Sequence, residues 1–201
     1  MGAIAFDLDG TLVDVKRRDF QVYSDILCSY SCTPIDIDLY WSFRREKKNI
    51  FEILRLSDFP PSYYGHFIKE RQELIERAEY LLLDELFPSV LSVLEYLRKN
   101  YKCILVTKRN NIEVTNEQLK RLRLIDCFED IHITLLDKKL IFQTIESLQY
   151  VIGDTENDII PANSLNVSTI AVSSGIRGEM ELAKLRPSYL INNFQKILDI
   201  L

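Results

Sequence analysis

The sequence lacks the features that mark secreted, membrane-spanning and nucleic-acid-binding proteins. Asp7 and Asp9 interrupt the N-terminal apolar stretch almost at once, so it does not fit a secretory signal peptide. Phe6 stands where the N-myristoylation pattern requires Ser or Thr, and no apolar run approaches the roughly 18 residues of a membrane span. The net charge is -5, whereas a broad nucleic-acid surface needs clustered Lys and Arg. We therefore expect a soluble protein with neither nucleic-acid nor membrane partners, although a locally positive pocket for a small anion remains compatible with this charge.

Cysteine and histidine are also scarce. Cys28 and Cys32 are the only two of the four cysteines that are close in sequence, and their spacing fits neither a zinc knuckle nor a redox CxxC pair. We interpret the cysteines as reduced thiols and expect a cytoplasmic protein. The two histidines stand alone, without the pattern of a triad or a metal cluster, and we expect His66 at the surface and His132 in a strand.

The chain contains, instead, short apolar runs separated by stretches of helical length. Low glycine and proline content and the absence of repeats indicate a folded protein. Amphipathic stretches that begin at Pro88, Glu113 and Lys138 lie between the later runs. Alternation of strand and helix predicts an α/β fold with a parallel sheet covered on both faces. The runs predicted to be strands are 3–6, 103–107, 131–134, 150–153 and 168–172.

Residues 15–84 have a different pattern. They show helical periodicity without a convincing buried strand, and the proline-containing segments 31–36 and 57–63 are expected to be turns. We predict a helical domain over 15–84, inserted into a core made of 1–14 and 85–201.

Polar side chains follow four of the predicted strands. In open parallel sheets the carboxyl ends of the strands form the ligand-binding edge, so these residues are expected to converge. Several carboxylates at one edge repel one another unless a cation binds them, and oxygen ligands favour Mg²⁺. The residues concerned are Asp7, Asp9, Thr107, Lys108, Lys138, Lys139, Asp154 and Asp158.

Four motifs in this order, FDLDGTLVD, ILVTKR, DKK and VIGDTENDI, resemble those of the haloacid dehalogenase (HAD) superfamily. The resemblance covers essentially the whole chain and is nearest in style to phosphoglycolate-phosphatase-like and β-phosphoglucomutase-like members. It implies a Rossmann-like core, a central parallel sheet flanked by helices, with an inserted α-helical cap of the C1 type.

The resemblance also implies roles for the acidic residues. Asp7 would attack phosphorus to form an aspartyl-phosphate, and Asp9 would act as general acid and then as general base. Mg²⁺ would be bound by the Asp7 carboxylate, the Asp9 backbone carbonyl, Asp154 and Asp158. An aspartate at position 9 favours phosphate-ester chemistry, because dehalogenases and phosphonatases of the superfamily lack it.

A hydroxyl and a lysine complete the implied phosphate site. Thr107 would donate a hydrogen bond to a phosphate oxygen, and a lysine would neutralise the transferring group. Lys138 is preferred, with Lys139 as the alternative, because Ile141, Phe142 and Ile145 share a helical face with Lys138. The other expected phosphate-site or substrate-site residues are Leu8, Gly10, Thr11 and Lys108.

Two departures from the family pattern lie beyond Asp158. Pro161 forfeits a backbone hydrogen bond unless the helix there starts late. Asn166 replaces the usual glycine, and Asn tolerates the left-handed conformation that this position needs.

The basic residues near the predicted cap leave alternatives open. The run at 44–48 is interpreted as a solvated helix face, but it also has the charge to select an anionic leaving group. Arg17, Arg18 and Arg109 have the same two interpretations. The aromatic residues Trp41, Tyr63 and Tyr64 are expected to pack within the cap rather than to stack on bases.

These patterns predict a Mg²⁺-dependent phosphatase that acts on a small phosphorylated metabolite through an aspartyl-phosphate intermediate. A phosphosugar mutase is the first alternative, because it uses the same two aspartates. A noncatalytic phospholigand-binding protein is the second, although such a protein has no need of both Asp7 and Asp9. The oligomeric state remains open.

Overall fold

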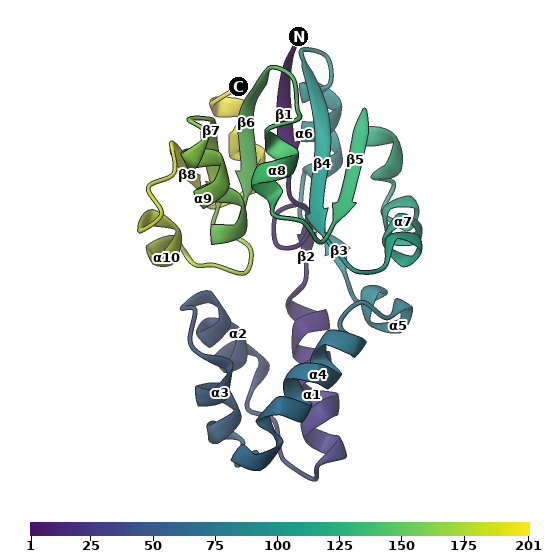
Figure 1. Ribbon diagram of the computed structural model, residues 1–201, viewed down its shortest axis with the longest axis vertical. Helices are drawn as coiled ribbons and strands as arrows, with labels where there is room; N and C mark the ends of the chain where they lie inside the picture. Colours follow the sequence, from purple (N-terminus) through teal and green to yellow (C-terminus); the bar gives the residue numbers. More distant parts are fainter.

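A computed structural model describes residues 1–201. Six strands form one parallel sheet in the order β5-β4-β1-β6-β7-β8 (Figure 1). The strands are β1 (Gly2–Phe6), β4 (Tyr101–Lys108), β5 (Asp130–Thr134), β6 (Leu148–Gly153), β7 (Ser168–Val172) and β8 (Tyr189–Ile191). The α/β fold predicted from the sequence is therefore confirmed, and β1, which carries Asp7 at its end, lies in the middle of the sheet.

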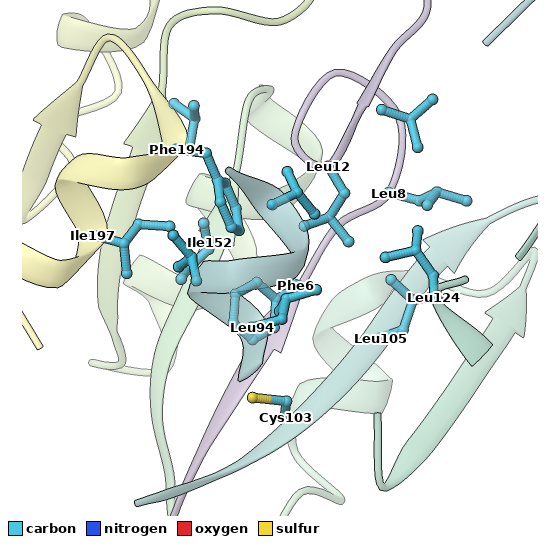
Figure 2. Close-up of a cluster of buried hydrophobic side chains, with 14 of the residues drawn as sticks. Phe6, Leu8, Leu12, Leu94, Cys103, Leu105, Leu124, Ile152, Phe194 and Ile197 are labelled. Carbon is cyan, nitrogen blue, oxygen red and sulfur yellow. The ribbon is translucent and has the colours of Figure 1, made fainter. Parts of the chain in front are cut away.

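The sheet is buried on both faces because its strands are apolar at successive positions. In β1, Ile4 and Phe6 contribute to one hydrophobic cluster, whereas Ala3 and Ala5 contribute to another on the opposite face. Figure 2 shows the larger cluster, in which Phe6 lies among side chains from neighbouring strands and helices.

Helices cover the two faces. Helix α6 (Val90–Leu97), α7 (Ile112–Arg121) and the 3₁₀ helix η3 (Phe194–Asp199) supply residues to the larger cluster. Helix α8 (Lys138–Phe142) and α9 (Glu156–Ser164) supply residues to the opposite one. The remaining elements of this part are η2 (Ile125–Cys127) and α10 (Glu179–Ala183). None of the helices in the molecule combines the length and apolarity needed to cross a membrane.

Residues 15–84 form a bundle below the carboxyl edge of the sheet (Figure 1). We call this bundle the cap. It has its own hydrophobic cluster, in which Tyr23 and Tyr40 stack with ring centroids 4.5 Å apart. The cap contains α1 (Lys16–Ser29), α2 (Ile37–Arg45), α3 (Ile50–Leu56), η1 (Pro61–Tyr63), α4 (Tyr64–Leu74) and α5 (Ala78–Leu81).

The chain enters and leaves the cap through a short antiparallel ribbon. Strand β2 (Val13–Asp14) pairs with β3 (Glu85–Leu86), so that Val13 lies opposite Leu86 and Asp14 opposite Glu85. The predicted division at residues 14 and 85 falls in this ribbon, and we propose the ribbon as the boundary of the inserted domain.

Some predicted elements differ from the structure. The helix expected to run on from Lys138 ends at Phe142, and the chain then turns through Ser147, which has φ 57, before β6 begins at Leu148. Ile145 therefore does not continue the helical face that favoured Lys138. Within the segment of helical periodicity that follows the predicted turn at 57–63, the helix is interrupted after Leu74, and Arg77 is extended.

Helix α9 starts at Glu156, before Asp158, so Pro161 lies inside the helix and cannot donate a backbone hydrogen bond there. Asn166 has φ 56 and so adopts the left-handed conformation expected of it. The thiols also agree with expectation, since all four cysteines are free. His66 is exposed, and His132 lies half-buried in β5.

Candidate active site

A small cavity lies at the carboxyl edge of the sheet, where the cap faces the core. We call it the site cavity. Its volume is about 130 Å³, and the five predicted site residues that line it come from three segments, namely the turn after β1, the end of β4 and the start of α8. The lining residues are Asp7, Asp9, Thr107, Lys108, Lys138, Thr155, Asn157 and Ile176.

Three carboxylates gather beside this cavity. Oxygen atoms of Asp7, Asp154 and Asp158 lie within 4.8 Å of one another, and all three residues are buried. Burial, together with the charge of Asp158, raises the pKa of Asp7 to about 7. Burial and then the charges of Asp7 and Asp158 raise the pKa of Asp154 well above its usual value. Negative charge is therefore in excess here, and the all-oxygen donor set fits a hard divalent cation such as Mg²⁺.

Lys138 partly offsets this excess. Its ammonium group donates to Asp7 Oδ1 and to Asp158 Oδ1, at 2.6 Å in each case. Burial would lower the pKa of Lys138, but the charges of Asp158 and Asp7 outweigh it and raise that pKa. Lys138 reaches this place because Asp137 caps the helix by accepting a hydrogen bond from the Lys139 backbone. The Lys139 side chain forms no ion pair, so the structure brings Lys138 to the carboxylates and not Lys139.

Asp9 has a separate set of partners. Its Oδ1 atom accepts hydrogen bonds from Arg109 Nη2 at 2.6 Å and lies 2.9 Å from Arg18 Nη2. Burial alone would raise the pKa of Asp9, but Arg109 and then Arg18 outweigh it and hold that pKa below its usual value. Neither arginine is a solvated residue, since each is 3% exposed. Arg17, in contrast, pairs with Glu85 at the surface, which agrees with the solvated one of its two interpretations.

Two further residues, Asp84 and Gln118, contact these arginines, and the sequence pattern did not indicate either of them. Asp84 Oδ1 lies 3.3 Å from Arg18 Nε, and Asp84 Oδ2 accepts a hydrogen bond from Gln118 Nε2 at 2.6 Å. Burial raises the pKa of Asp84 to about 7. Asp84 stands just before β3, and Arg18 lies in the first turn of α1, which follows β2, so this ion pair joins the segments on the two sides of the ribbon.

The turn after β1 is tightly wound over Asp154. Gly10 has φ +79, and a Cβ there would lie 2.0 Å from Asp154 Oδ2. Thr11 Oγ1 donates to Asp154 Oδ1 at 3.3 Å, and the Leu8 side chain is fully buried in the larger hydrophobic cluster. Leu8, Gly10 and Thr11 therefore shape the turn and support Asp154, and they do not line the site cavity.

Sequence reasoning also missed three residues that line the cavity, namely Thr155, Asn157 and Ile176. Thr155 donates its hydroxyl to Asp158 Oδ2 at 3.0 Å and completes a capping box at the start of α9. The signal for it was present in the sequence, as Thr followed three positions later by Asp. No sequence pattern indicates that Ile176 lines the cavity, because this residue lies in the loop between β7 and α10, beyond the last of the four motifs.

The prediction of a solvated face for 44–48 is wrong at its first two positions. Arg44 Nε donates to Asp19 Oδ2 at 2.9 Å within the cap, and Arg45 donates to backbone carbonyls of the core. Lys47 and Lys48 are exposed, as expected. The prediction that Trp41, Tyr63 and Tyr64 pack within the cap is confirmed for Tyr64 but wrong for Trp41, which packs against the core. Tyr63 lies between these outcomes, since its ring centroid is 5.2 Å from that of Tyr30 while the residue is 42% exposed. Trp41 joins the larger hydrophobic cluster, and Tyr64 stacks on Phe51 with centroids 4.8 Å apart.

Known proteins resemble this chain along its length. Pyrophosphatase PpaX of Bacillus mycoides (strain KBAB4) is 23% identical over 225 residues, which cover 100% of this chain and 97% of that protein. A phosphoglycolate phosphatase of Synechococcus elongatus is 24% identical over 208 residues, which cover 98% of this chain and 96% of that protein.

Two solved structures share the fold. A haloacid dehalogenase-like hydrolase from Streptococcus pneumoniae superposes with a TM-score of 0.79 at 20% identity and covers 100% of this chain and 98% of its own. YfnB from Bacillus subtilis, whose structure was determined bound to magnesium, gives a TM-score of 0.66 at 18% identity, with 100% of this chain and 98% of its own covered. The family model for haloacid dehalogenase-like hydrolases matches residues 4–172. With most of its length matched by that model, the chain belongs to the haloacid dehalogenase-like hydrolase family.

Proposed function

We propose that this protein is a Mg²⁺-dependent phosphatase that hydrolyses a small phosphomonoester through an aspartyl-phosphate on Asp7. The observation that carries the proposal is the position of the Asp7 carboxylate. It lies in the wall of the site cavity, bonded to Lys138 and within 4.8 Å of Asp154 and Asp158. A carboxylate placed in this way is accessible to a phosphoryl group, and its negative charge is balanced by Lys138 and would be balanced further by a cation bound with Asp154 and Asp158.

The reaction divides between the two aspartates of the first motif. An Asp7 oxygen forms a bond to phosphorus while the bond from phosphorus to the ester oxygen breaks, and Asp9 gives the departing oxygen a proton. Asp9 then accepts a proton from water, whose oxygen attacks phosphorus and releases inorganic phosphate and the free Asp7 carboxylate. Arg18 and Arg109 favour the ionised form of Asp9, which is the base of the second step, so the proton donated in the first step is held against this preference.

The cation-binding residues fit this chemistry. Asp7, Asp154 and Asp158 supply carboxylate oxygens, and we propose the Asp9 backbone carbonyl as a further ligand. A bound Mg²⁺ would offset the repulsion between the phosphoryl oxygens and the Asp7 nucleophile. Thr107 and Lys108 line the cavity at the end of β4, where they are suited to bind phosphoryl oxygens. Lys138 holds Asp7 in place through its 2.6 Å hydrogen bond.

The substrate class follows from the size and charge of the site. A cavity of about 130 Å³, lined by core residues at the edge of the sheet that the cap faces, has room for a phosphoryl group with a small leaving group. Curated relatives act on phosphoglycolate and on pyrophosphate according to their names, and both are small phosphoryl compounds.

Hydrolysis of p-nitrophenyl phosphate tests the proposal. The wild-type protein should release nitrophenol only with Mg²⁺, and Asp7→Asn should lower kcat by at least about 1000-fold, because loss of a nucleophile removes the covalent route. Asp199→Asn, an exposed position far along the chain, is the matched control and should retain activity.

A panel of phosphoglycolate, pyrophosphate, hexose phosphates and nucleotides then identifies the substrate. Retained activity in Asp7→Asn would contradict the proposed nucleophile. Isomerisation of a sugar phosphate without release of phosphate would contradict the phosphatase assignment and support a mutase.

A further inference from the structure

One loop of the core touches both the cap and the proposed metal site. Residues 173–178 connect β7 to α10, and we call them the docking loop. In Figure 1 the end of α2 lies directly below the α10 region that this loop enters. The docking loop therefore connects the cap physically to the carboxylates of the proposed metal site.

On its core side, the docking loop orients Asp154. The Ile176 backbone N–H donates to Asp154 Oδ2 at 2.6 Å, whereas Thr11 makes only a long contact of 3.3 Å with Oδ1. The loop backbone comes this close to Asp154 only because residue 175 is glycine. A Cβ at Gly175 would lie 2.1 Å from the Gly10 carbonyl oxygen and 2.3 Å from Asp154 Oδ2. The Ile176 N–H is thus the shorter of the two hydrogen bonds that fix the Asp154 carboxylate.

On its cap side, the docking loop is bound by Arg45 at the end of α2. Arg45 Nη1 donates to the Gly175 carbonyl at 2.7 Å, and Nη2 donates to the Ser173 carbonyl at 2.7 Å. The loop returns a hydrogen bond from Gly178 N to the Arg45 carbonyl at 3.0 Å. Two parallel donors on one planar group fix both the position and the direction of the acceptors.

The decisive detail is that both contacts act on one peptide group. The carbonyl bound by Arg45 Nη1 and the N–H bound to Asp154 belong to the single peptide that joins Gly175 and Ile176. That peptide is planar, so fixing the direction of its C=O also fixes the direction of its N–H. A charged donor on the oxygen further polarises the peptide and strengthens the N–H as a donor to Asp154.

We propose that Arg45 is a positioning residue that couples docking of the cap to the affinity of the Asp154 site for Mg²⁺. The inference rests on the Mg²⁺ site of the proposed function, and it adds to it a cap residue that acts on the metal through a core peptide. Because coupling is reciprocal, bound Mg²⁺ favours the docked cap to the same extent that the docked cap favours Mg²⁺.

The chain contains its own probe of cap docking. Trp41 is the only tryptophan, lies on α2 one turn before Arg45, and is buried in the cluster that includes core residues such as Leu8 and Leu12. Undocking of α2 exposes this ring to water, so the wavelength of its fluorescence reports the position of the cap.

The test uses the full chain as wild type, Arg45→Met, Arg45→Lys and the matched control Arg55→Met, whose arginine is exposed on α3 of the cap. Calorimetric titration with MgCl₂ should show a Mg²⁺ Kd raised about 5- to 20-fold in Arg45→Met, within the usual range of coupling between sites. Arg55→Met should stay within twofold of wild type. Arg45→Lys should fall between them, because an ammonium group lacks the two parallel donors.

Two further readouts separate positioning from simple support of the cap. Trp41 emission of metal-free Arg45→Met should lie to the red of wild type and return on addition of Mg²⁺, at a higher midpoint concentration. With p-nitrophenyl phosphate, the Mg²⁺ concentration for half-maximal rate should rise by the same factor as Kd, while kcat at saturating Mg²⁺ changes less than about threefold.

The outcomes are distinguishable from those of the proposed function, since Mg²⁺ binding is measured without turnover. A raised Kd supports the inference even where no substrate is hydrolysed. An unchanged Kd in folded Arg45→Met overturns it, whether or not its thermal stability falls, because Arg45 then only secures the cap. If Arg45→Met does not fold, an unchanged Kd in Arg45→Lys overturns it in the same way.

Discussion

At the scale of single residues, Lys138 carries the clearest electrostatic role, because it lies between two of three buried carboxylates. Lys138→Met should lower kcat/KM for p-nitrophenyl phosphate on the order of 100- to 1000-fold, since one charged donor is removed from a buried site. Lys139→Met tests the neighbouring lysine and should change kcat/KM less than about threefold. Equal losses in the two variants would contradict the assignment of the role to Lys138.

The raised pKa values make Mg²⁺ binding depend on pH. Metal ligands bind as carboxylates, so protons on Asp7, with a pKa of about 7, and on Asp154 compete with the ion. Affinity for Mg²⁺ should therefore rise with pH through about 7, by up to about tenfold per unit for each proton displaced. Calorimetry between pH 5.5 and 8.5 measures this slope, and a flat profile would contradict it. Asp7→Asn should make the slope shallower.

Most of the site residues that directly follow a strand could be predicted from the sequence. Several of the site residues that lie on helices or distant loops could not. Asp7, Thr107 and Asp154 are predictable because the carboxyl ends of parallel strands share an edge. Arg18 and Arg109 stayed ambiguous, since whether an arginine is solvated or pairs with Asp9 depends on contacts across 100 residues of sequence in the case of Arg109. Nothing in the local pattern of Asp84 indicates its contact with Arg18.

At the scale of elements, helix α9 has a well-capped N-terminus but a proline in its interior. Thr155 and Asp158 cap its start, whereas Pro161 leaves its interior without one backbone donor. Pro161→Ala should stabilise the protein by about 1 to 2 kcal/mol, because the helical penalty of proline, about 3 kcal/mol, exceeds the entropy that alanine returns to the unfolded chain. Urea unfolding measures the change.

Pro187→Ala is the matched control for this substitution, because Pro187 lies in the loop before β8 and outside any helix. It should leave stability unchanged or lower it slightly. Equal effects at the two positions would mean that the missing donor inside α9 is not the source of the gain.

Elements with continuous apolar sequence were predictable, and short ones were not. The run 168–172 coincides with β7, and the other four predicted strands are extended in the structure by one to three residues. Strand β8 has only the three residues Tyr189–Ile191, and the ribbon strands have two each, so neither presents a period that a sequence can show. Helix α8 has only five residues, and the turn from it into β6 contains a left-handed residue, Ser147, that the helical periodicity did not indicate.

At the scale of the whole molecule, the core and the cap each have a hydrophobic cluster of their own, and Trp41 of the cap packs in the core cluster. Phe67 is fully buried among cap residues, and Phe194 is buried against Phe6 in the core. Phe67→Ala should cost the cap about 3 to 5 kcal/mol through loss of packing. Hydrogen exchange should then accelerate in α1 to α4 while β1, β4 and β6 keep their protection.

Phe194→Ala is the reciprocal variant and should accelerate exchange in the sheet. Uniform acceleration throughout the chain in Phe67→Ala would contradict independent stability of the two clusters.

The β2–β3 ribbon limits how the cap can move. Because Val13–Asp14 and Glu85–Leu86 are hydrogen-bonded to each other, the two connections bend as one strip and not as two independent tethers. The cap also contacts the core on the two sides of the ribbon. On one side Arg45 binds the docking loop. On the other side the Glu76 carboxylate accepts hydrogen bonds from Asn110 N and Asn111 N at 2.8 and 3.0 Å. The cap is therefore tied to the core at three places, with the ribbon between two side-chain contacts, so any displacement of the cap must bend the ribbon or break at least one of these contacts.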